Sequence, residues 1–122
     1  MAKIHYQRQP SEFTCGQTCV AMLTGIRVDD VISEIHGHTT SVADLGGYLR
    51  KSGWHAAWSL TRVNKHVRWP EFAILRAMWP KTGRIGHWML WADGRIYDPW
   101  SDPTAYQLGG GRITSYIHIE RS

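Results

Sequence analysis

The sequence lacks the long apolar runs, cysteine clusters and repeats that mark several large classes of protein. None of its apolar runs approaches the ~18 residues that a transmembrane helix needs. Two cysteines among 122 residues are too few for a disulfide scaffold. With 43% hydrophobic and 20% charged residues, the composition is that of a globular protein. A membrane-spanning, disulfide-rich, collagenous or disordered chain is therefore excluded as an overall description.

The N-terminal segment also lacks the apolar stretch of a secretory signal peptide. Residues 1–9 are polar, which predicts a cytoplasmic protein without a membrane partner. A chain of 122 residues has room for one hydrophobic core and can bury roughly two-thirds of its unfolded surface. We therefore expect residues 1–122 to form a single domain.

Positive charge is in modest excess but is not clustered. The net charge is +4, and the fourteen lysines and arginines are scattered, with no basic run longer than Arg50-Lys51. A nucleic-acid-binding face should gather its charges, so a mildly basic solvated surface is favoured over a nucleic-acid partner. Seven tryptophans are unusual for this length; they indicate core packing, a substrate groove lined with indoles, or both.

Helix signals occupy the first half of the sequence. Thr14 and Gln17 have the spacing of a capping box, and Gly25 is a stop signal. Ser41 and Asp44 repeat the capping pattern further along the chain. The expected helices cover residues 15–23, 28–35 and 42–52.

The second half changes to strand signals. Asp93-Gly94 predicts a two-residue hairpin turn, and residues 114–120 alternate apolar and polar positions. Helices followed by antiparallel strands predict an α+β fold. The expected strands cover residues 54–60, 72–78, 87–92, 95–98 and 114–120.

Cys15 is a candidate nucleophile because it opens the first expected helix. The free N–H groups and partial positive charge of a helix N-terminus favour the thiolate, which is the reactive form. Gly16 leaves the backbone at this turn open to a substrate, and Gln9 can supply a side-chain amide to a developing oxyanion. A cysteine at a helix start is more often structural, so this signal alone does not decide the function.

The hairpin around Asp93-Gly94 supplies a base and a carboxylate. If these residues are the centre of the turn, Trp91 lies opposite Ile96, and His87 and Asp98 are diagonal neighbours on one face. A histidine oriented by an acid and facing a helix-start cysteine completes the set needed for nucleophilic catalysis. The pattern contains no convincing metal set, because the pair His36 and His38 lacks a third ligand nearby.

These residues resemble a known family. Gln9, followed after five residues by Cys15-Gly16 and an apolar helix, resembles the active-site helix of papain-like cysteine peptidases. It is most similar to that of the double-glycine peptidases that process bacteriocin leaders, and of their stand-alone relatives. Gly86-His87-Trp88 and Asp98-Pro99 resemble the family's histidine strand and aspartate strand end. Thr14 and Gln17 stand where Asp and Pro are common.

The resemblance implies a papain-like fold with a catalytic triad. In it Cys15 is the nucleophile, His87 the base, Asp98 the residue that orients the base, and Gln9 an oxyanion donor. Gly16, Trp88 and Trp100 are then expected at the substrate, with Trp100 shielding the His–Asp hydrogen bond from water. No cofactor and no metal are implied.

Several functions remain compatible with these residues. The first is a cysteine hydrolase that cleaves a peptide or isopeptide bond in a peptide or protein substrate. The same triad can act on a glutamine side chain, as a deamidase or transglutaminase. The fold can also serve as a non-catalytic peptide-binding module. The sequence does not indicate the oligomeric state.

Overall fold

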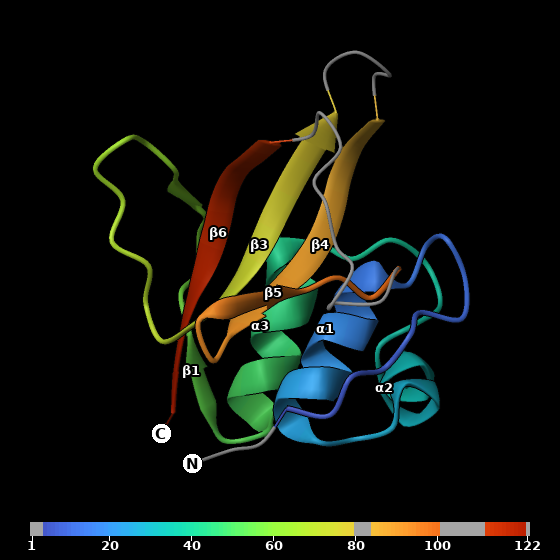
Figure 1. Ribbon diagram of the computed structural model, residues 1–122. Helices are drawn as coiled ribbons and strands as arrows, with labels where there is room; N and C mark the ends of the chain where they lie inside the picture. Colours follow the sequence, from blue (N-terminus) through green and yellow to red (C-terminus); the bar gives the residue numbers. More distant parts are fainter. Residues whose placement is uncertain (1–3, 80–83, 101–111, 122) are drawn as a thin grey trace.

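The computed structural model describes residues 4–79, 84–100 and 112–121. Three helices precede an antiparallel sheet, so the predicted α+β class is confirmed (Figure 1). The helices are α1 (Cys15–Thr24), α2 (Val28–Glu34) and α3 (Val42–Lys51). The strands are β1 (Trp54–Ala56), β2 (Thr61–Arg62), β3 (Phe72–Trp79), β4 (Arg84–Ala92), β5 (Arg95–Tyr97) and β6 (Arg112–Arg121).

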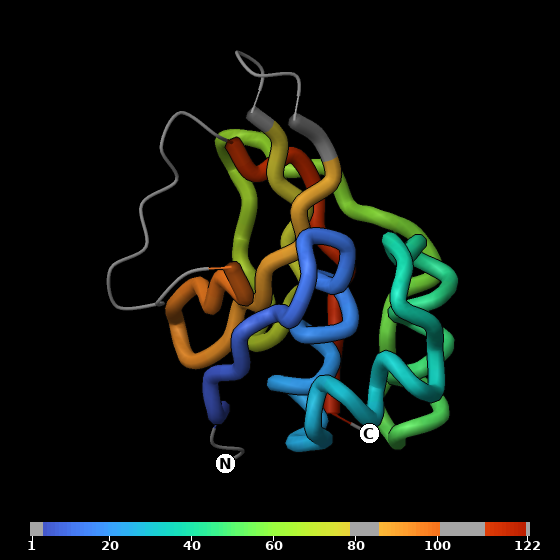
Figure 2. Tube along the Cα trace, turned by 90° about the vertical axis from the view of Figure 1, so that its right-hand side faces the viewer, coloured from blue at the N-terminus to red at the C-terminus, as the bar shows by residue number. Residues whose placement is uncertain are grey.

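The sheet has β3 and β4 at its centre, and the helices cover only part of one face. The strand order is β1-β6-β3-β4-β5, and β2 pairs with β6 above β1. Helix α1 packs on β4 and α3 on β1. In both views, β3 and β4 continue beyond the ends of the helices (Figures 1 and 2). The helices described here include none long and apolar enough to cross a membrane.

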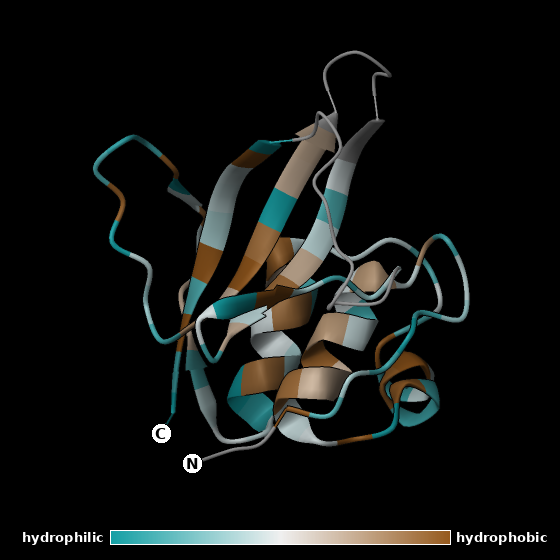
Figure 3. Cartoon of the chain, in the orientation of Figure 1, coloured by the Kyte–Doolittle hydropathy of each residue, from teal (hydrophilic) through white to brown (hydrophobic). Residues whose placement is uncertain are grey.

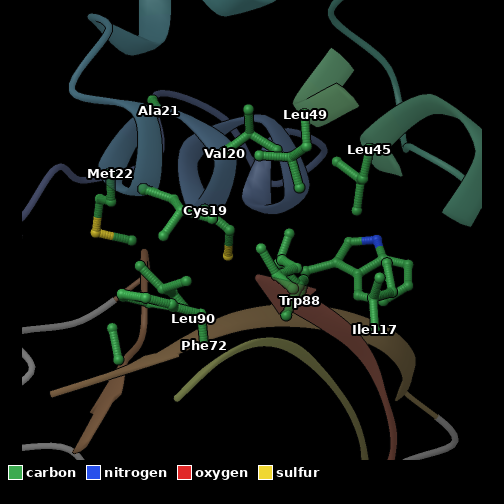
Figure 4. Close-up of a cluster of buried hydrophobic side chains, with 14 of the residues drawn as sticks. Cys19, Val20, Ala21, Met22, Leu45, Leu49, Phe72, Trp88, Leu90 and Ile117 are labelled. Atoms are coloured by element: carbon green, nitrogen blue, oxygen red, sulfur yellow. The ribbon is translucent and has the colours of Figure 1, made fainter. Parts of the chain in front are cut away.

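The main core lies between the helices and this sheet face. Both α1 and α3 contain apolar residues, brown in Figure 3, and the buried side chains of these helices belong to this core. Cys19 is fully buried there, and the Trp88 indole lies near Leu45 and Ile117 (Figure 4). A second, smaller cluster on the opposite face packs the segment around Val67 and Trp69 against β3 and β4. Strand β4 is thus buried on both faces, as its nearly continuous apolar sequence predicts.

Two local predictions are confirmed by backbone geometry. Asp93 and Gly94 both have positive φ, 55° and 71°, which is the conformation of a two-residue hairpin turn. The register follows from it: Trp91 pairs with Ile96, and Ala92 with Arg95. At the start of α3, the Ser41 hydroxyl accepts the Asp44 N–H, and the Asp44 carboxylate accepts the Ser41 N–H.

The capping box predicted at Thr14 is wrong. Its hydroxyl makes no bond to the helix and instead engages Ser11, whose carbonyl it meets at 3.1 Å. Gln17 is fully buried, and its amide donates to the carbonyls of His36 (2.8 Å) and His38 (2.7 Å). The buried contacts of the Gln17 side chain therefore replace the hydrogen bond that would have completed the capping box.

The strand predicted over residues 54–60 is also too long. Strand β1 ends at Ala56, and the N–H of Ala57 makes the last bond toward β6, at 2.9 Å to the His118 carbonyl. Trp58 then leaves the sheet, is 81% exposed and lies under the Arg50 guanidinium. The strand therefore ends before Trp58, because this side chain turns outward and packs against Arg50.

Candidate active site

Cys15 is the first residue of α1 and faces strand β4. The thiol is largely buried, and its sulfur accepts the backbone N–H of Trp88 at 3.4 Å. The N-terminus of α1 therefore lies against the segment that carries His87. Residues 73 positions apart meet here because α1 packs along β4.

His87 and Asp98 form a buried pair. Nε2 of His87 lies 2.7 Å from Oδ1 of Asp98, and both residues are less than 10% exposed. The predicted contact is present, although Asp98 follows the end of β5 in a turn instead of sitting in a strand pair. Gly86, with φ of 84°, takes the extra position where the pairing of β3 and β4 shifts just before His87.

Asp98 is held through both its side chain and its backbone. The carboxylate Oδ1 also accepts the backbone N–H of Trp100 at 2.9 Å, and the backbone carbonyl of Asp98 accepts the Tyr6 hydroxyl at 2.7 Å. Asp98 is thus fixed before any substrate arrives. Sequence reasoning missed Tyr6, because the N-terminal segment carries no periodic signal that would place it at this strand end.

His87 is positioned to be protonated at neutral pH. Burial lowers its pKa, but the hydrogen bonds and charges of Asp98 and Cys15 outweigh burial and raise the pKa to about 9. Because Nε2 lies on the carboxylate, Nδ1 is the ring nitrogen left for the thiol. An imidazolium between a sulfur and a carboxylate is the arrangement that favours a thiolate.

Cys19 provides an internal contrast. It lies one turn after Cys15 on α1 and is fully buried. Burial first, and then the charges of Cys15 and Asp98, raise the pKa of Cys19 well above its usual value. Both cysteines are free thiols. Cys19 is therefore a core residue, as its place on the apolar face of the helix predicts, and only Cys15 lies beside the histidine.

Gln9 lies near the site, but its amide is directed to a neighbour. Its backbone N–H donates to the Pro99 carbonyl at 2.8 Å, which ties it to the strand end after Asp98. Its side-chain Nε2 donates to the Ser11 carbonyl at 2.6 Å, and its Oε1 is buried without a partner. One N–H of that amide remains for an oxyanion. No hydrogen bond between Gln9 and Cys15 occurs among the described residues.

The three expected substrate residues lie in different environments. Trp88 is 5% exposed and its indole N–H donates to the Thr40 carbonyl at 3.2 Å, so its ring packs within the core. Gly16 is buried beneath that ring. Trp100 is 42% exposed and contacts Asp98 through its backbone. Because this indole is exposed, the expected shielding of the His87–Asp98 hydrogen bond by Trp100 stays a prediction.

Gly16 is required by close packing. A Cβ added there would lie 2.1 Å from Oγ1 of Thr40 and 3.0 Å from the Trp88 ring. We expect Gly16→Ala to lower the free energy of unfolding by about 1–3 kcal/mol, measured by urea denaturation. The matched control is Gly47→Ala in α3, where nothing lies within 4 Å; it should be stabilising by roughly 0.5–1 kcal/mol. Equal effects of the two changes would contradict the packing role.

The His36–His38 segment is held by contacts within the protein. His36 pairs with Asp44, with Nε2 and Oδ2 3.3 Å apart. No group of three or more potential ligands occurs within residues 4–79, 84–100 and 112–121. This segment is instead anchored to α1 through the buried amide of Gln17.

Comparison of the chain with family models and with curated proteins gave no match. The case for a function therefore depends on the geometry: a helix-start thiol, an imidazole and a fixed carboxylate lie in one buried cluster.

Proposed function

We propose that this protein is a papain-like cysteine hydrolase that cleaves a peptide or isopeptide bond. The observation that carries the proposal is the buried pair of His87 and Asp98 beside the Cys15 thiol, whose sulfur meets the backbone N–H of the residue after His87. Buried ion pairs that serve stability alone have no need of a thiol at a helix N-terminus. The order of helix, histidine strand and aspartate turn supports the papain-like arrangement.

In the proposed reaction, the Cys15 thiolate attacks the substrate carbonyl carbon. The negative oxygen that forms is bound by the Cys15 backbone N–H and the remaining N–H of the Gln9 amide. The His87 imidazolium gives its proton to the leaving amine, and the C–N bond breaks to leave a thioester on Cys15. His87, now neutral, takes a proton from water, which attacks the thioester and releases the acid and the thiolate. Asp98 holds the ring in place throughout.

We place this reaction in the cytoplasm, with a peptide or protein as substrate. A reducing compartment keeps Cys15 and Cys19 as the free thiols seen in the structure. An oxidising compartment would expose a reactive thiolate to sulfenic acid formation and to mixed disulfides.

The test of the proposal is the reactivity of Cys15 toward limiting iodoacetamide between pH 5 and 9. We expect rapid labelling of Cys15 already at pH 6, where an ordinary thiol with pKa ~8.5 is less than about 1% thiolate. Cys19 should stay unlabelled because it is buried. Peptide mass spectrometry locates the label, and His87→Ala should slow labelling of Cys15 by about a hundredfold at pH 6.

Two results of this test would contradict the proposal. Labelling of Cys15 that rises only near pH 8.5 would indicate an ordinary thiol and favour a peptide-binding module. Equal rates of Cys15 labelling in the wild type and in His87→Ala would show that the imidazole does not activate the thiol. Given an active thiol, a peptide library then defines the reaction: new N-termini indicate hydrolysis, whereas ammonia release without them indicates a glutamine deamidase or transglutaminase.

A further inference from the structure

A row of paired residues crosses the sheet next to Cys15. Trp88 on β4, whose N–H meets the Cys15 sulfur, pairs with Arg76 on β3. Arg76 pairs with Ser115 on β6, and Ser115 with Arg62 on β2. Paired residues share a sheet face, so the four side chains lie on the face that the helices cover lower down. These four residues lie where the helices stop covering this face of the sheet.

A pocket of about 390 Å³ opens along this row. It lies on the part of β3 and β6 that extends past the helices in Figure 1. Two arginines line it and no acidic residue does. Its lining consists of Leu60, Arg62, Arg76, Met78, Thr114 and Ser115.

Arg76 is incompletely paired in this pocket. Its Nε is buried and has no hydrogen-bond partner, and neither Arg76 nor Arg62 forms an ion pair with any described residue. A guanidinium with a buried, unpartnered N–H and no ion pair carries an uncompensated charge, which an anion bound at its terminal nitrogens would balance. The fork of N–H groups on an arginine fits a carboxylate with two parallel bonds.

The guanidinium of Arg76 also lies close to the catalytic residues. Its Cζ is 5.9 Å from the centre of the Trp88 ring. One of its terminal nitrogens lies 3.8 Å from the position of a Cβ built on Gly86, the residue before His87. A ligand bound at Arg76 is therefore next to the strand segment that carries the base.

We propose that this pocket binds a carboxylate of the peptide substrate, with Arg76 as the main contact and Arg62 as a second charge. The enzyme would then prefer peptides with an acidic side chain or a free carboxyl terminus close to the scissile bond. This inference rests on the proposed function, because it treats Cys15 as the reacting group. A peptide fits better than a nucleic acid, since two arginines in one pocket do not make the basic stripe that a phosphate backbone requires.

The first test compares three matched alkylating probes. N-iodoacetyl-glutamine amide is neutral, N-iodoacetyl-glutamic acid α-amide carries a side-chain carboxylate, and N-iodoacetyl-glutamine carries an α-carboxylate. The readout is the rate of Cys15 labelling by each acid divided by the rate with the neutral probe, since this ratio is insensitive to thiol activation. We expect a ratio of about ten or more for one of the two acids. The acid that gives it identifies which carboxylate is bound.

Substitutions in the pocket test whether its arginines cause this ratio of labelling rates. Arg76→Gln should reduce it to about one or two, and Arg62→Gln should reduce it less. The control Arg27→Gln removes the same charge from an 82% exposed side chain at the start of α2, and should leave the ratio unchanged. A ratio that survives in Arg76→Gln, or that falls equally in Arg27→Gln, would overturn the proposal.

A second measurement does not depend on Cys15 reactivity. The Nε–H resonance of Arg76 is followed by NMR while the wild type is titrated with N-acetyl-glutamic acid α-amide, N-acetyl-glutamine or neutral N-acetyl-glutamine amide. A saturable shift with one acid and not with the amide would support the pocket even if Cys15 proved unreactive. No shift with either acid would overturn the pocket even if Cys15 alkylated rapidly. A larger shift with thymidylyl-thymidine would assign the pocket to nucleic-acid phosphates and also overturn the proposal.

Discussion

Cys15→Ser and His87→Ala should each abolish the turnover of p-nitrophenyl acetate that we expect of the wild-type protein. The thiolate attacks the ester carbonyl and expels p-nitrophenolate, which leaves an acetyl thioester on Cys15. Water, activated by His87, then releases acetate. The assay can be run without knowing the natural substrate. The nitrophenolate leaving group needs no proton, so the attack of the thiolate is the step that this assay reports. Release of nitrophenolate is followed by absorbance at pH 7.

The two variants should fail at different steps. Cys15→Ser should show no burst of nitrophenolate, since a serine hydroxyl is a far weaker nucleophile at this site. His87→Ala should acylate about a thousandfold more slowly and retain the acetyl group, visible as an added mass on the Cys15 peptide. Cys19→Ala is the matched control and should keep the wild-type burst. A burst of wild-type size in His87→Ala would show that the imidazole does not assist the thiol.

Local sequence signals were sufficient where they involve neighbouring residues. The Asp93-Gly94 turn fixed the register of β4 and β5 and so brought His87 to Asp98. The pair Ser41 and Asp44 capped α3 as expected. In each case the partners are a few residues apart, and the geometry follows from backbone preferences alone.

Signals that compete with tertiary contacts were unreliable. Thr14 and Gln17 have the same spacing as a true capping box, yet Gln17 is drawn into the interior by two distant carbonyls. The amide of Gln9 turns to Ser11, which its distance from Cys15 in the sequence could not reveal. A local pattern therefore predicts a contact only when no buried partner offers a better one.

The arginine pocket could not be found from the sequence. Arg62 and Arg76 look like two of fourteen scattered basic residues until β2, β6 and β3 are placed side by side. The scattered pattern indicated a solvated surface with no preferred ligand. Strand register changes that view for this pair, because it places both charges on one sheet face, with Arg76 paired to Trp88 beside the candidate nucleophile.

Asp98→Asn should lower the pKa of His87 from about 9. The asparagine keeps the size of the side chain but removes the charge that favours the imidazolium, while burial continues to oppose it. NMR titration of the His87 ring measures this shift directly. At neutral pH the variant should therefore hold less of the imidazolium, and its p-nitrophenyl acetate turnover should fall by about a hundredfold. An unchanged pKa would show that Asp98 does not control the ring.

The same shift predicts how stability depends on pH. His87 has a higher pKa in the folded protein than in the unfolded chain, so the folded state binds the proton more tightly. The resulting stabilisation is fully present below pH 6.5 and is lost as the pH rises through about 9. A shift from 6.5 to about 9 corresponds to roughly 3 kcal/mol in the free energy of unfolding. Urea denaturation of Cys15→Ala at intervals between pH 6 and 9 measures the part of this decline that Asp98 supplies. The variant is needed because, in the proposed mechanism, Cys15 releases a proton on folding and offsets the one that His87 gains.

In the Cys15→Ala background, Asp98→Asn should weaken that decline, because the variant gains less of a proton on folding. It should also be less stable than Cys15→Ala alone at pH 6, and the two should converge toward pH 9. The control is His36→Gln in the same background, which removes a half-exposed histidine paired with Asp44; it should leave the pH dependence intact. A Cys15→Ala curve that is flat over this range, or that rises, would mean that Asp98 does not hold a proton on His87. The role of Asp98 in the proposed mechanism would then fail.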